Sequence, residues 1–356
     1  MTAENTSVGA TVRVTVDLSA LESNYQALCQ AAAPGRCGAV VKADAYGLGV
    51  TPVVERLVQA GCSAFFVATL EEGIQVRASA PAATIFVFAG VDAESSAGLV
   101  EADLTPMLNA AFQIEHWRGR SKPAAIHLDT GMGRLGFPWD QVRPDLFEGL
   151  DITLLATHLA CADQPDHPLN ALQVHRFAEV ARRFPSVATS IGNSAGTLSG
   201  ATSQGDLCRP GIALYGGNPF VDGPNPMSAV VTLEARILQI REVKAGATIG
   251  YGATHVAGAS GLIATLGIGY ADGLPRSVSN RGEVLVAKHR APIVGRVSMD
   301  LTTVDISDVK PTPKVGDWVE VLGKDLGIDA LASCAETIGY EVLTGLGQRA
   351  ARRYLG

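Results

Sequence analysis

The stretch "GAVVKADAYGLG", residues 38–49, decides how the first half of the chain is interpreted. Its small and apolar residues are typical of a buried strand, yet they run directly into Lys42. Asp44, Tyr46 and two glycines follow, which is the composition of a loop. A lysine at this point is either a snorkelling surface side chain or a functional amine where a strand opens into an active site.

Seven more short apolar runs follow, and helical patterns separate them. The eight runs are GAVVKA (38–43), AFFVA (64–68), TIFVFAG (84–90), LTPML (104–108), AAIHLD (124–129), ITLLATH (152–158), TSIGN (189–193) and DLCRPGI (206–212). The segments "SALE" (19–22) and "TLEE" (69–72) have the form of capping boxes that start helices. Alternation of this kind predicts a (β/α)8 barrel over residues 14–227, with a doubly wound sheet as the alternative.

The pattern changes after Met227. Longer alternating segments such as "VVTLEARILQIREV" (230–243) and "GLIATLGIGYADG" (261–273) are separated by Gly, Asn and Pro turns. They predict a second, mostly β domain over residues 228–356, to which residues 1–13 are a candidate addition.

Composition limits the partners. The chain has 356 residues, 47% of them hydrophobic, and a net charge of −7, so it lacks the basic surplus that nucleic acid or an anionic membrane requires. Its start, "MTAENTSVGATVRV", does not have the layout of a signal peptide, and we expect a cytoplasmic protein with a small-molecule substrate. Six dispersed cysteines without a C-x-x-C pair predict neither a metal site nor a disulfide framework.

In a barrel of this type the active site lies at the carboxyl ends of the strands, and polar residues gather there in this sequence. Amide-rich segments after strands seven and eight form the usual phosphate site of the fold. A lysine facing such a site suggests pyridoxal 5′-phosphate, because the aldehyde needs an amine and the phosphate needs an anion cradle. The residues at the strand ends are Lys42, Arg134, His158, Asn193, Ser194, Arg209 and Gly211.

Motifs along nearly the whole chain resemble those of alanine racemases that depend on pyridoxal phosphate. The resemblance implies interconversion of L- and D-alanine by two acid/base groups in a homodimer with shared active sites. A broad-specificity or serine-preferring racemase and a related decarboxylase are the alternatives. The motifs are VVKADAYGLG (40–49), HLDTGMGRLG (127–136), THLACAD (157–163), NSAG (193–196), CRPGIALYGGNP (208–219), IGYGATH (249–255), GIGYADG (267–273) and GRVSMD (295–300).

The resemblance implies a role for each site residue. Lys42 would join the cofactor aldehyde as an imine and act as one acid/base at the substrate Cα, and Tyr251 would be the other. Without the family, a core tyrosine and a buried histidine are the plainer interpretations of Tyr251 and His158. Phosphate contacts would come from Tyr46, Ser194 and the amides of Gly211 and Ile212, with Asn193 beside them.

Arg209 is implied to face the pyridine nitrogen, with His158 behind it. A guanidinium only donates, so it would leave that nitrogen unprotonated and favour reprotonation at Cα over transamination. Arg134 would steady the cofactor phenolic oxygen and the substrate carboxylate. Met299, through its backbone, and Tyr270 would limit the substrate pocket, while Asp163, Tyr270 and Arg276 would form the entrance.

One departure from the family concerns residue 127. Many members carry a lysine here, modified to a carbamate that orients the arginine, whereas this chain has His127. The sequence therefore leaves open what steadies Arg134, with an anion and a neighbouring side chain as the two possibilities. It also leaves open whether the enzyme supplies D-alanine for cell-wall synthesis or consumes it.

Overall fold

The computed structural model describes residues 9–200 and 205–356, which divide into two compact units. The first unit consists of residues 22–214 and 218–227. The second consists of residues 9–21, 215–217 and 228–356. The boundary between them falls within helix α1 (Leu18–Ala32), so the strand that precedes this helix belongs to the second unit.

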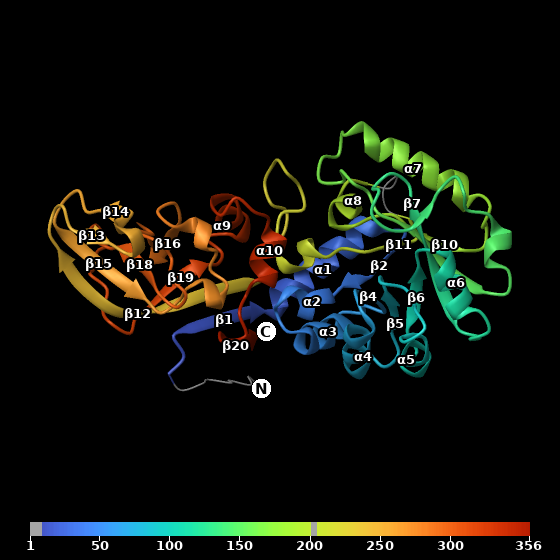
Figure 1. The fold of residues 1–356 in the computed structure, drawn as a ribbon, viewed down its shortest axis with the longest axis horizontal. Coiled ribbons are helices and arrows are strands. Elements are labelled where there is room, and N and C mark those ends of the chain that lie inside the picture. Colours follow the sequence, from blue (N-terminus) through green and yellow to red (C-terminus); the bar gives the residue numbers. More distant parts are fainter. Residues whose placement is uncertain (1–8, 201–204) are drawn as a thin grey trace. The chain divides into compact units, whose positions relative to one another are not determined.

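The first unit contains the predicted barrel. Its parallel strands form a sheet in the order β10-β9-β7-β6-β5-β4-β3, and β11 pairs with β2, which leads into β3 (Figure 1). The amide of Arg209 after β11 donates to the carbonyl of Gly192 after β10 at 2.7 Å, which joins the two edges. The (β/α)8 prediction is therefore confirmed. The strands are β2 (Arg36–Cys37), β3 (Ala39–Val40), β4 (Ala64–Val67), β5 (Thr84–Val87), β6 (Thr105–Leu108), β7 (Pro123–Asp129), β8 (Phe137–Pro138, on the outer part of β7), β9 (Asp151–Thr157), β10 (Ala188–Ser190) and β11 (Leu207–Cys208).

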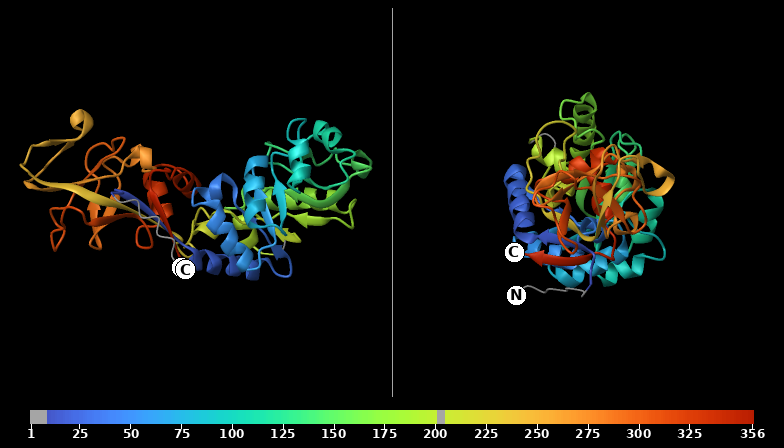
Figure 2. Two further views of the ribbon diagram at one scale, coloured as in Figure 1. Left: turned by 90° about the horizontal axis from the view of Figure 1, so that it is seen from below. Right: turned by 90° about the vertical axis from the view of Figure 1, so that its left-hand side faces the viewer.

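Helices connect these strands and lie outside them (Figures 1 and 2). Helix α3 (Val50–Gln59) shows why: Val50, Val53, Val54 and Leu57 recur at helical spacing and are buried. Helix α4 begins after Thr69, whose side chain accepts from the Glu72 amide as predicted. Helix α1 instead begins at Leu18 and is capped by Asp17, so the predicted cap at Ser19 is wrong. The other helical elements of this unit are α2 (Lys42–Tyr46, a short segment with left-handed backbone), α3 (Val50–Gln59), α4 (Leu70–Ser79), α5 (Ser96–Glu101), α6 (Ala111–Trp117), α7 (Pro168–Ala181), α8 (Ser194–Leu198) and the short 3-10 turn η1 (Pro144–Phe147).

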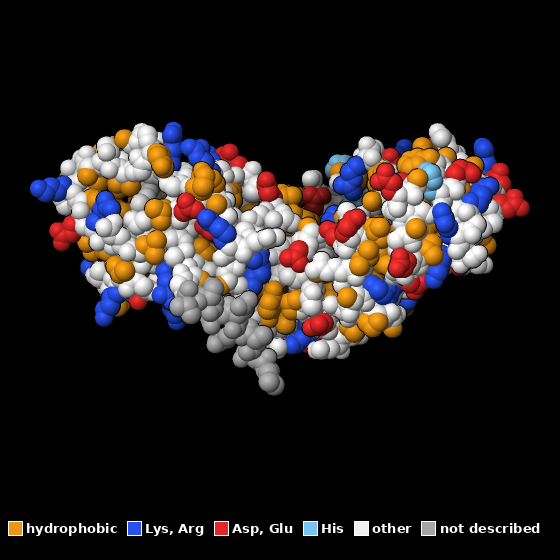
Figure 3. Space-filling model, turned by 60° about the horizontal axis from the view of Figure 1, so that its bottom comes forward, with side chains coloured by type: hydrophobic (Ala, Val, Ile, Leu, Met, Phe, Trp, Pro, Cys, Tyr) orange, Lys and Arg blue, Asp and Glu red, His pale blue; other side chains and the backbone are white. Residues whose placement is uncertain are grey.

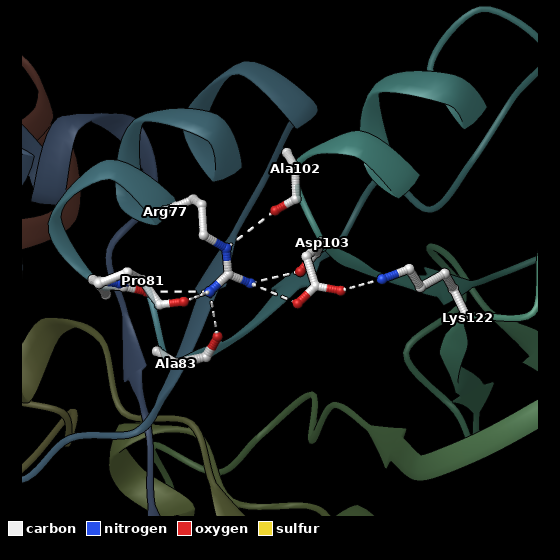
Figure 4. Close-up of polar contacts among 7 residues, drawn as sticks. Arg77, Pro81, Ala83, Ala102, Asp103 and Lys122 are labelled. Atoms are coloured by element: carbon white, nitrogen blue, oxygen red, sulfur yellow. Dashed lines mark hydrogen bonds and ion pairs between the residues drawn. The ribbon is translucent and has the colours of Figure 1, made fainter.

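The amino ends of three barrel strands are tied together by Arg77 on α4 (Figure 4). Its guanidinium donates to the carbonyls of Ala80, Pro81, Ala83, Ala102 and Asp103 at 2.5–3.1 Å. The Asp103 carboxylate also pairs with Lys122 at 2.7 Å. Because Ala83, Asp103 and Lys122 precede β5, β6 and β7, this cluster fixes the floor of the barrel.

The second unit is mostly β, as predicted. The long strand β12 (Val231–Val243) organises it, pairing antiparallel with β1 (Val12–Asp17), β15 (Gly261–Leu266) and β19 (Trp318–Leu322). Strand β1 also pairs in parallel with the last strand, β20 (Ala351–Leu355). The remaining elements are β13 (Thr248–Ile249), β14 (His255–Val256), β16 (Glu283–Val286), β17 (His289–Pro292), β18 (Thr302–Asp305), α9 (Ile328–Cys334), α10 (Gly339–Thr344) and the short 3-10 turns η3 (Ile212–Tyr215), η4 (Tyr251–Ala253), η5 (Tyr270–Asp272) and η6 (Arg276–Val278), of which η3 begins in the barrel unit.

Acidic and basic side chains are interspersed on the face drawn in Figure 3, which agrees with the modest negative net charge. Among residues 9–200 and 205–356, no helix has the length and apolar character needed to cross a bilayer.

Candidate active site

Lys42 stands where the first barrel strand ends. It is half-buried, and its Nζ lies 5.8 Å from the centroid of the Phe88 ring. Phe88 belongs to an aromatic stack with Phe66 and Phe86 inside the barrel. Burial lowers the pKa of Lys42, and the charge of Arg134 lowers it further, against an opposing effect of Glu72. The amine is therefore easier to deprotonate than an exposed lysine.

The backbone after Lys42 forms a left-handed turn. Ala43, Asp44, Ala45 and Tyr46 have φ values of 53°, 54°, 53° and 57°, a region that residues with a side chain seldom adopt. Glu72 anchors the turn, because its carboxylate accepts from the amide of Ala43 and, at the end of β4, from that of Ala68, both at 2.7 Å.

Tyr46, the last residue of this turn, lies against Gly211, which in turn contacts Ser194. The Ser194 hydroxyl accepts from the amides of Gly211 at 2.9 Å and Ala213 at 3.2 Å. A Cβ added at Gly211 would overlap the hydroxyl of Tyr46, so only glycine allows this approach. Asn193 caps α8 by accepting from the Gly196 amide at 2.9 Å. Ile212, buried, follows directly at the start of η3.

Arg209 is 4% exposed at the end of the eighth strand. Its guanidinium donates to the Ser190 hydroxyl at 2.5 Å and to the Thr157 carbonyl at 2.6 Å, and it lies 6.0 Å from the Phe66 ring. Burial lowers the pKa of Arg209 to about 10. The group stays charged at neutral pH and can only donate hydrogen bonds.

Two histidines near Arg209 are neutral. Burial, followed by the charges of Arg209 and Arg134, lowers the pKa of His158 to about 3 and that of His127 to about 4. His127 Nδ1 lies 2.8 Å from Asn109 Oδ1. The mouth of the barrel therefore carries the charges of lysine and arginine side chains, while its histidines serve as neutral hydrogen-bonding groups.

Arg134 lies on the exposed loop after β7. The Asp129 carboxylate shapes this loop by accepting from the amides of Gly131, Met132 and Gly133 at 2.9–3.1 Å. Within the described part of the chain, Arg134 donates no hydrogen bond and forms no ion pair. Its effect on Lys42, His127 and His158 nevertheless shows that its charge acts at the mouth.

In the second unit, the loop 295–299 contacts both the segment of Tyr251 and the segment of Tyr270, two of the predicted site residues. Gly250, before Tyr251, lies against Arg296, and the Tyr270 and Ala271 amides donate to the carbonyls of Ser298 and Met299. Tyr251, Tyr270 and Met299 are 71%, 43% and 54% exposed. This loop cluster, defined by these three residues, therefore presents aromatic and apolar side chains to solvent.

The predicted entrance residues divide between the units. Asp163 lines a cavity of about 400 Å³ in the first unit, and its carbonyl accepts from the Val221 amide. Tyr270 lines a cavity of about 340 Å³ in the second unit. Arg276 is exposed at the start of η6.

Sequence reasoning missed the residues that hold the mouth in place. The buried Gln173 of α7 donates to the Thr130 hydroxyl and the His158 carbonyl and accepts from the Ala160 amide. Thr157 and Ser190 hold Arg209. A signal was available for these two, because each is a polar residue within an apolar run; Gln173 had none, since it lies in an ordinary helical pattern.

Comparisons with known proteins agree along the chain. The alanine racemase N-terminal domain matches residues 16–219 and the C-terminal domain matches residues 230–354. The alanine racemase of Rhodospirillum rubrum is 47% identical over 361 residues, covering 98% of this chain and 96% of that protein.

Two solved structures are similar over almost their full lengths. Alanine racemase from Bartonella henselae, with covalently bound pyridoxal phosphate, has 39% identity and a TM-score of 0.92, covering 97% of this chain and 100% of that one. The biosynthetic alanine racemase of Pseudomonas aeruginosa has 36% identity and a TM-score of 0.90, covering 98% and 100%. Matched in both domains by sequence and by fold, this chain belongs to the alanine racemase family.

Proposed function

We propose that this protein interconverts L- and D-alanine with pyridoxal 5′-phosphate as its cofactor. The observation that carries the proposal is the barrel mouth. A half-buried lysine with a lowered pKa, Lys42, is subject to the charge of Arg134 and begins the turn that ends at Tyr46, which forms a cradle with Ser194 and Gly211. Family membership supports the same activity.

The residues of the cradle fit a phosphate. The Ser194 hydroxyl accepts two amide hydrogens, which leaves its own hydrogen to donate to an anion. Glycine at position 211 keeps space beside the Tyr46 hydroxyl that a Cβ would fill. We assign Tyr46, Ser194, Gly211 and Ile212 to the phosphate, Asn193 to the support of their loop, and Lys42 to the aldehyde.

When bound, pyridoxal phosphate would supply an aldehyde for the substrate amine and withdraw electrons from the substrate Cα. Inversion at Cα removes a proton on one face and delivers one on the other, which two groups on opposite faces do best. We assign these proton transfers to Lys42 and Tyr251. Burial and Arg134 already prepare Lys42 by lowering its pKa.

Arg209 would hold the pyridine nitrogen by donation alone. Its buried guanidinium is fixed by Ser190 and Thr157, so it cannot swing away, and His158 remains neutral beside it. A donor that keeps its proton leaves the ring nitrogen unprotonated, which limits how far charge moves into the ring. Arg134 would bind the substrate carboxylate and the phenolic oxygen, while Met299 and Tyr270 would limit the pocket.

Deuterium incorporation tests the reaction. The purified holoenzyme is incubated in deuterated water with each enantiomer of alanine and of serine. We expect deuterium at Cα together with inversion, and faster exchange for alanine. Preference for serine would identify a serine racemase, and release of carbon dioxide with an amine would identify a decarboxylase instead.

We also propose a homodimer in which each active site combines Lys42 of one chain with Tyr251 of its partner. The loop cluster of Tyr251, Tyr270 and Met299 supports it, because such exposed aromatic and apolar side chains are typical of an interface. Two-fold symmetry makes both sites equivalent. The protein would work in the cytoplasm, in keeping with its six cysteines, none of which is joined in a disulfide.

Mixed dimers test the shared site. Lys42→Ala and Tyr251→Phe proteins, each nearly inactive, are unfolded and refolded together. Random pairing makes about half the dimers mixed, and one site in each mixed dimer has both residues intact, so roughly a quarter of the sites recover. If both residues met within one chain, proven mixed dimers would recover no activity.

A further inference from the structure

Two buried side chains, Gln113 and Asn109, form a relay that ends at the half-buried His127. The amide nitrogen of Asn109 donates to the carbonyls of Met107 at 2.7 Å and Phe88 at 3.0 Å. Gln113 accepts from the backbone amide of Asn109 at 2.7 Å and donates to the Ala89 carbonyl at 2.9 Å. Since backbone carbonyls only accept, these bonds fix which end of the Asn109 side chain is nitrogen.

The relay selects one tautomer of His127. The fixed Asn109 presents Oδ1 to His127 Nδ1 at 2.8 Å, and this oxygen can only accept. Nδ1 therefore carries the hydrogen. Burial and the charges of Arg209 and Arg134 keep the pKa of His127 near 4, so the ring is neutral and Nε2 has a free lone pair at neutral pH.

The charged groups around His127 are Arg209, Arg134 and Asp129. Both terminal nitrogens of Arg209 already donate, to Ser190, Thr157 and Ile191, and we assign its remaining hydrogens to the cofactor nitrogen. Asp129 accepts from the amides of its own loop. Arg134, in contrast, donates to no atom of residues 9–200 and 205–356, so it is the cation with hydrogens to give.

The loop of Arg134 returns to the backbone of His127. Two residues after Arg134, a Cβ added at Gly136 would lie 3.0 Å from the His127 carbonyl oxygen and 2.9 Å from the Asp129 amide nitrogen. Gly136 has a φ of 112°, which favours glycine in this tight return. Strand β8 then pairs with Leu128 and Asp129 of β7. The loop that carries Arg134 thus returns to the backbone of His127 within two residues.

We propose that His127 is a positioning residue for Arg134 when the cofactor is bound: its Nε2 then accepts a hydrogen bond from the Arg134 guanidinium, as the tautomer set by Asn109 and Gln113 allows. The kinetic effect of this assignment rests on the proposed function. The tautomer of His127 does not, because it follows from the hydrogen bonds of Asn109 and Gln113. Arg134 would be held by a neutral acceptor supplied by the chain, so its positive charge stays available to the substrate carboxylate.

Nitrogen-15 NMR of the holoenzyme tests the tautomer independently of activity. Histidine is labelled with ¹⁵N, and the His127→Gln spectrum assigns the signal. We expect His127 with a protonated Nδ1 and an unprotonated Nε2, unchanged between about pH 6 and 9. A hydrogen on Nε2, alone or in an imidazolium ring, would overturn the proposal even if the enzyme racemises alanine.

Kinetics test the link to Arg134. His127→Leu removes the acceptor and should lower kcat/KM for alanine by about ten- to hundredfold, as expected for a hydrogen bond to a charged group, mainly through KM. His127→Gln keeps an acceptor oxygen and should retain most activity. In an Arg134→Met background His127→Leu should add no further loss; equal losses in both backgrounds would show that His127 acts elsewhere.

Asn109→Asp gives a readout that a merely structural role would not move. A carboxylate at position 109 favours the imidazolium form of His127 against Arg209 and Arg134, and an imidazolium has no lone pair. We expect kcat/KM of this variant to fall at acidic pH and to recover at higher pH. The unmodified enzyme should not show this fall of kcat/KM from loss of the His127 lone pair. A pH profile identical to that of the unmodified enzyme would contradict the relay.

Discussion

Two arginines at opposite ends of the barrel have different surroundings. Arg77 at the floor donates to five backbone carbonyls and lies 3.9 Å from the Asp103 carboxylate. Arg209 at the mouth is more deeply buried and is held by a hydroxyl and carbonyls, with no carboxylate paired to it among the described residues. A buried charge without a counter-ion costs stability. The contacts of Arg77 at the floor stabilise the fold, whereas the buried charge of Arg209 at the mouth lowers stability but serves the chemistry of the site.

Lys42→Ala should have the largest effect, because it changes activity at the mouth of the barrel and leaves stability almost unchanged. The variant should lose racemase activity by more than about 10³-fold, because it lacks both the amine that binds the cofactor and one acid/base. It should also lose the imine absorption of the holoenzyme. Its thermal unfolding should stay close to normal, since one lysine at the mouth adds little to the core. A variant that still showed a lysine-linked imine would refute the assignment.

Arg209→Glu tests the chemical side of the comparison. A glutamate can share a proton with the pyridine nitrogen, so we expect racemisation about 10²-fold slower and more pyruvate released per racemisation event. Measuring this ratio makes the result independent of how much protein is folded. Arg209→Lys is the control, because it keeps a cation. An unchanged ratio in Arg209→Glu would show that the guanidinium does not govern the outcome.

Arg77→Met should do the reverse of Lys42→Ala. The loss of the carbonyl bonds at the floor should lower the free energy of unfolding by about 2–4 kcal/mol, measured by urea denaturation. Activity per folded molecule should remain, because the floor lies at the end of the strands opposite the mouth. Arg77→Lys, which can replace only some of the bonds, should fall between. A large fall in kcat with normal stability would contradict the assignment of stability to the floor and catalysis to the mouth.

The smallest effect concerns the neutral histidines of the mouth. Their pKa values, about 4 for His127 and about 3 for His158, lie below the ordinary value near 6.5. As pH falls below about 6.5, the unfolded chain binds protons that the folded chain does not, so stability falls, by up to about 1.4 kcal/mol per pH unit for each histidine. Urea denaturation at pH 7 and pH 5 should show a smaller loss for His127→Gln. If His127→Gln and the unmodified protein lost equal stability between pH 7 and pH 5, His127 would be excluded as a cause of the pH dependence.

Periodicity was enough to predict the eight barrel strands, because each is a short apolar run separated from the next by a helical pattern. It was not enough for β1, whose partners β12 and β20 lie more than 200 residues away in sequence. Asn109 stood at the end of the run LTPML like the predicted site residues. Its importance depends on the rotamer that Met107 and Phe88 impose, which no pattern encodes.

The left-handed turn after Lys42 reverses the usual rules of substitution. Left-handed backbone costs roughly 1–2 kcal/mol for each residue with a side chain, and glycine does not incur this cost. Glycine at the exposed Ala43 should therefore raise the stability of the fold, whereas glycine within ordinary helices and strands lowers it. The same change would widen the range of backbone angles between Lys42 and Tyr46. The position of the Lys42 amine would then be less well defined. Stabilising this enzyme by substitution should thus spare the turn, since its strain is what keeps the amine in one place.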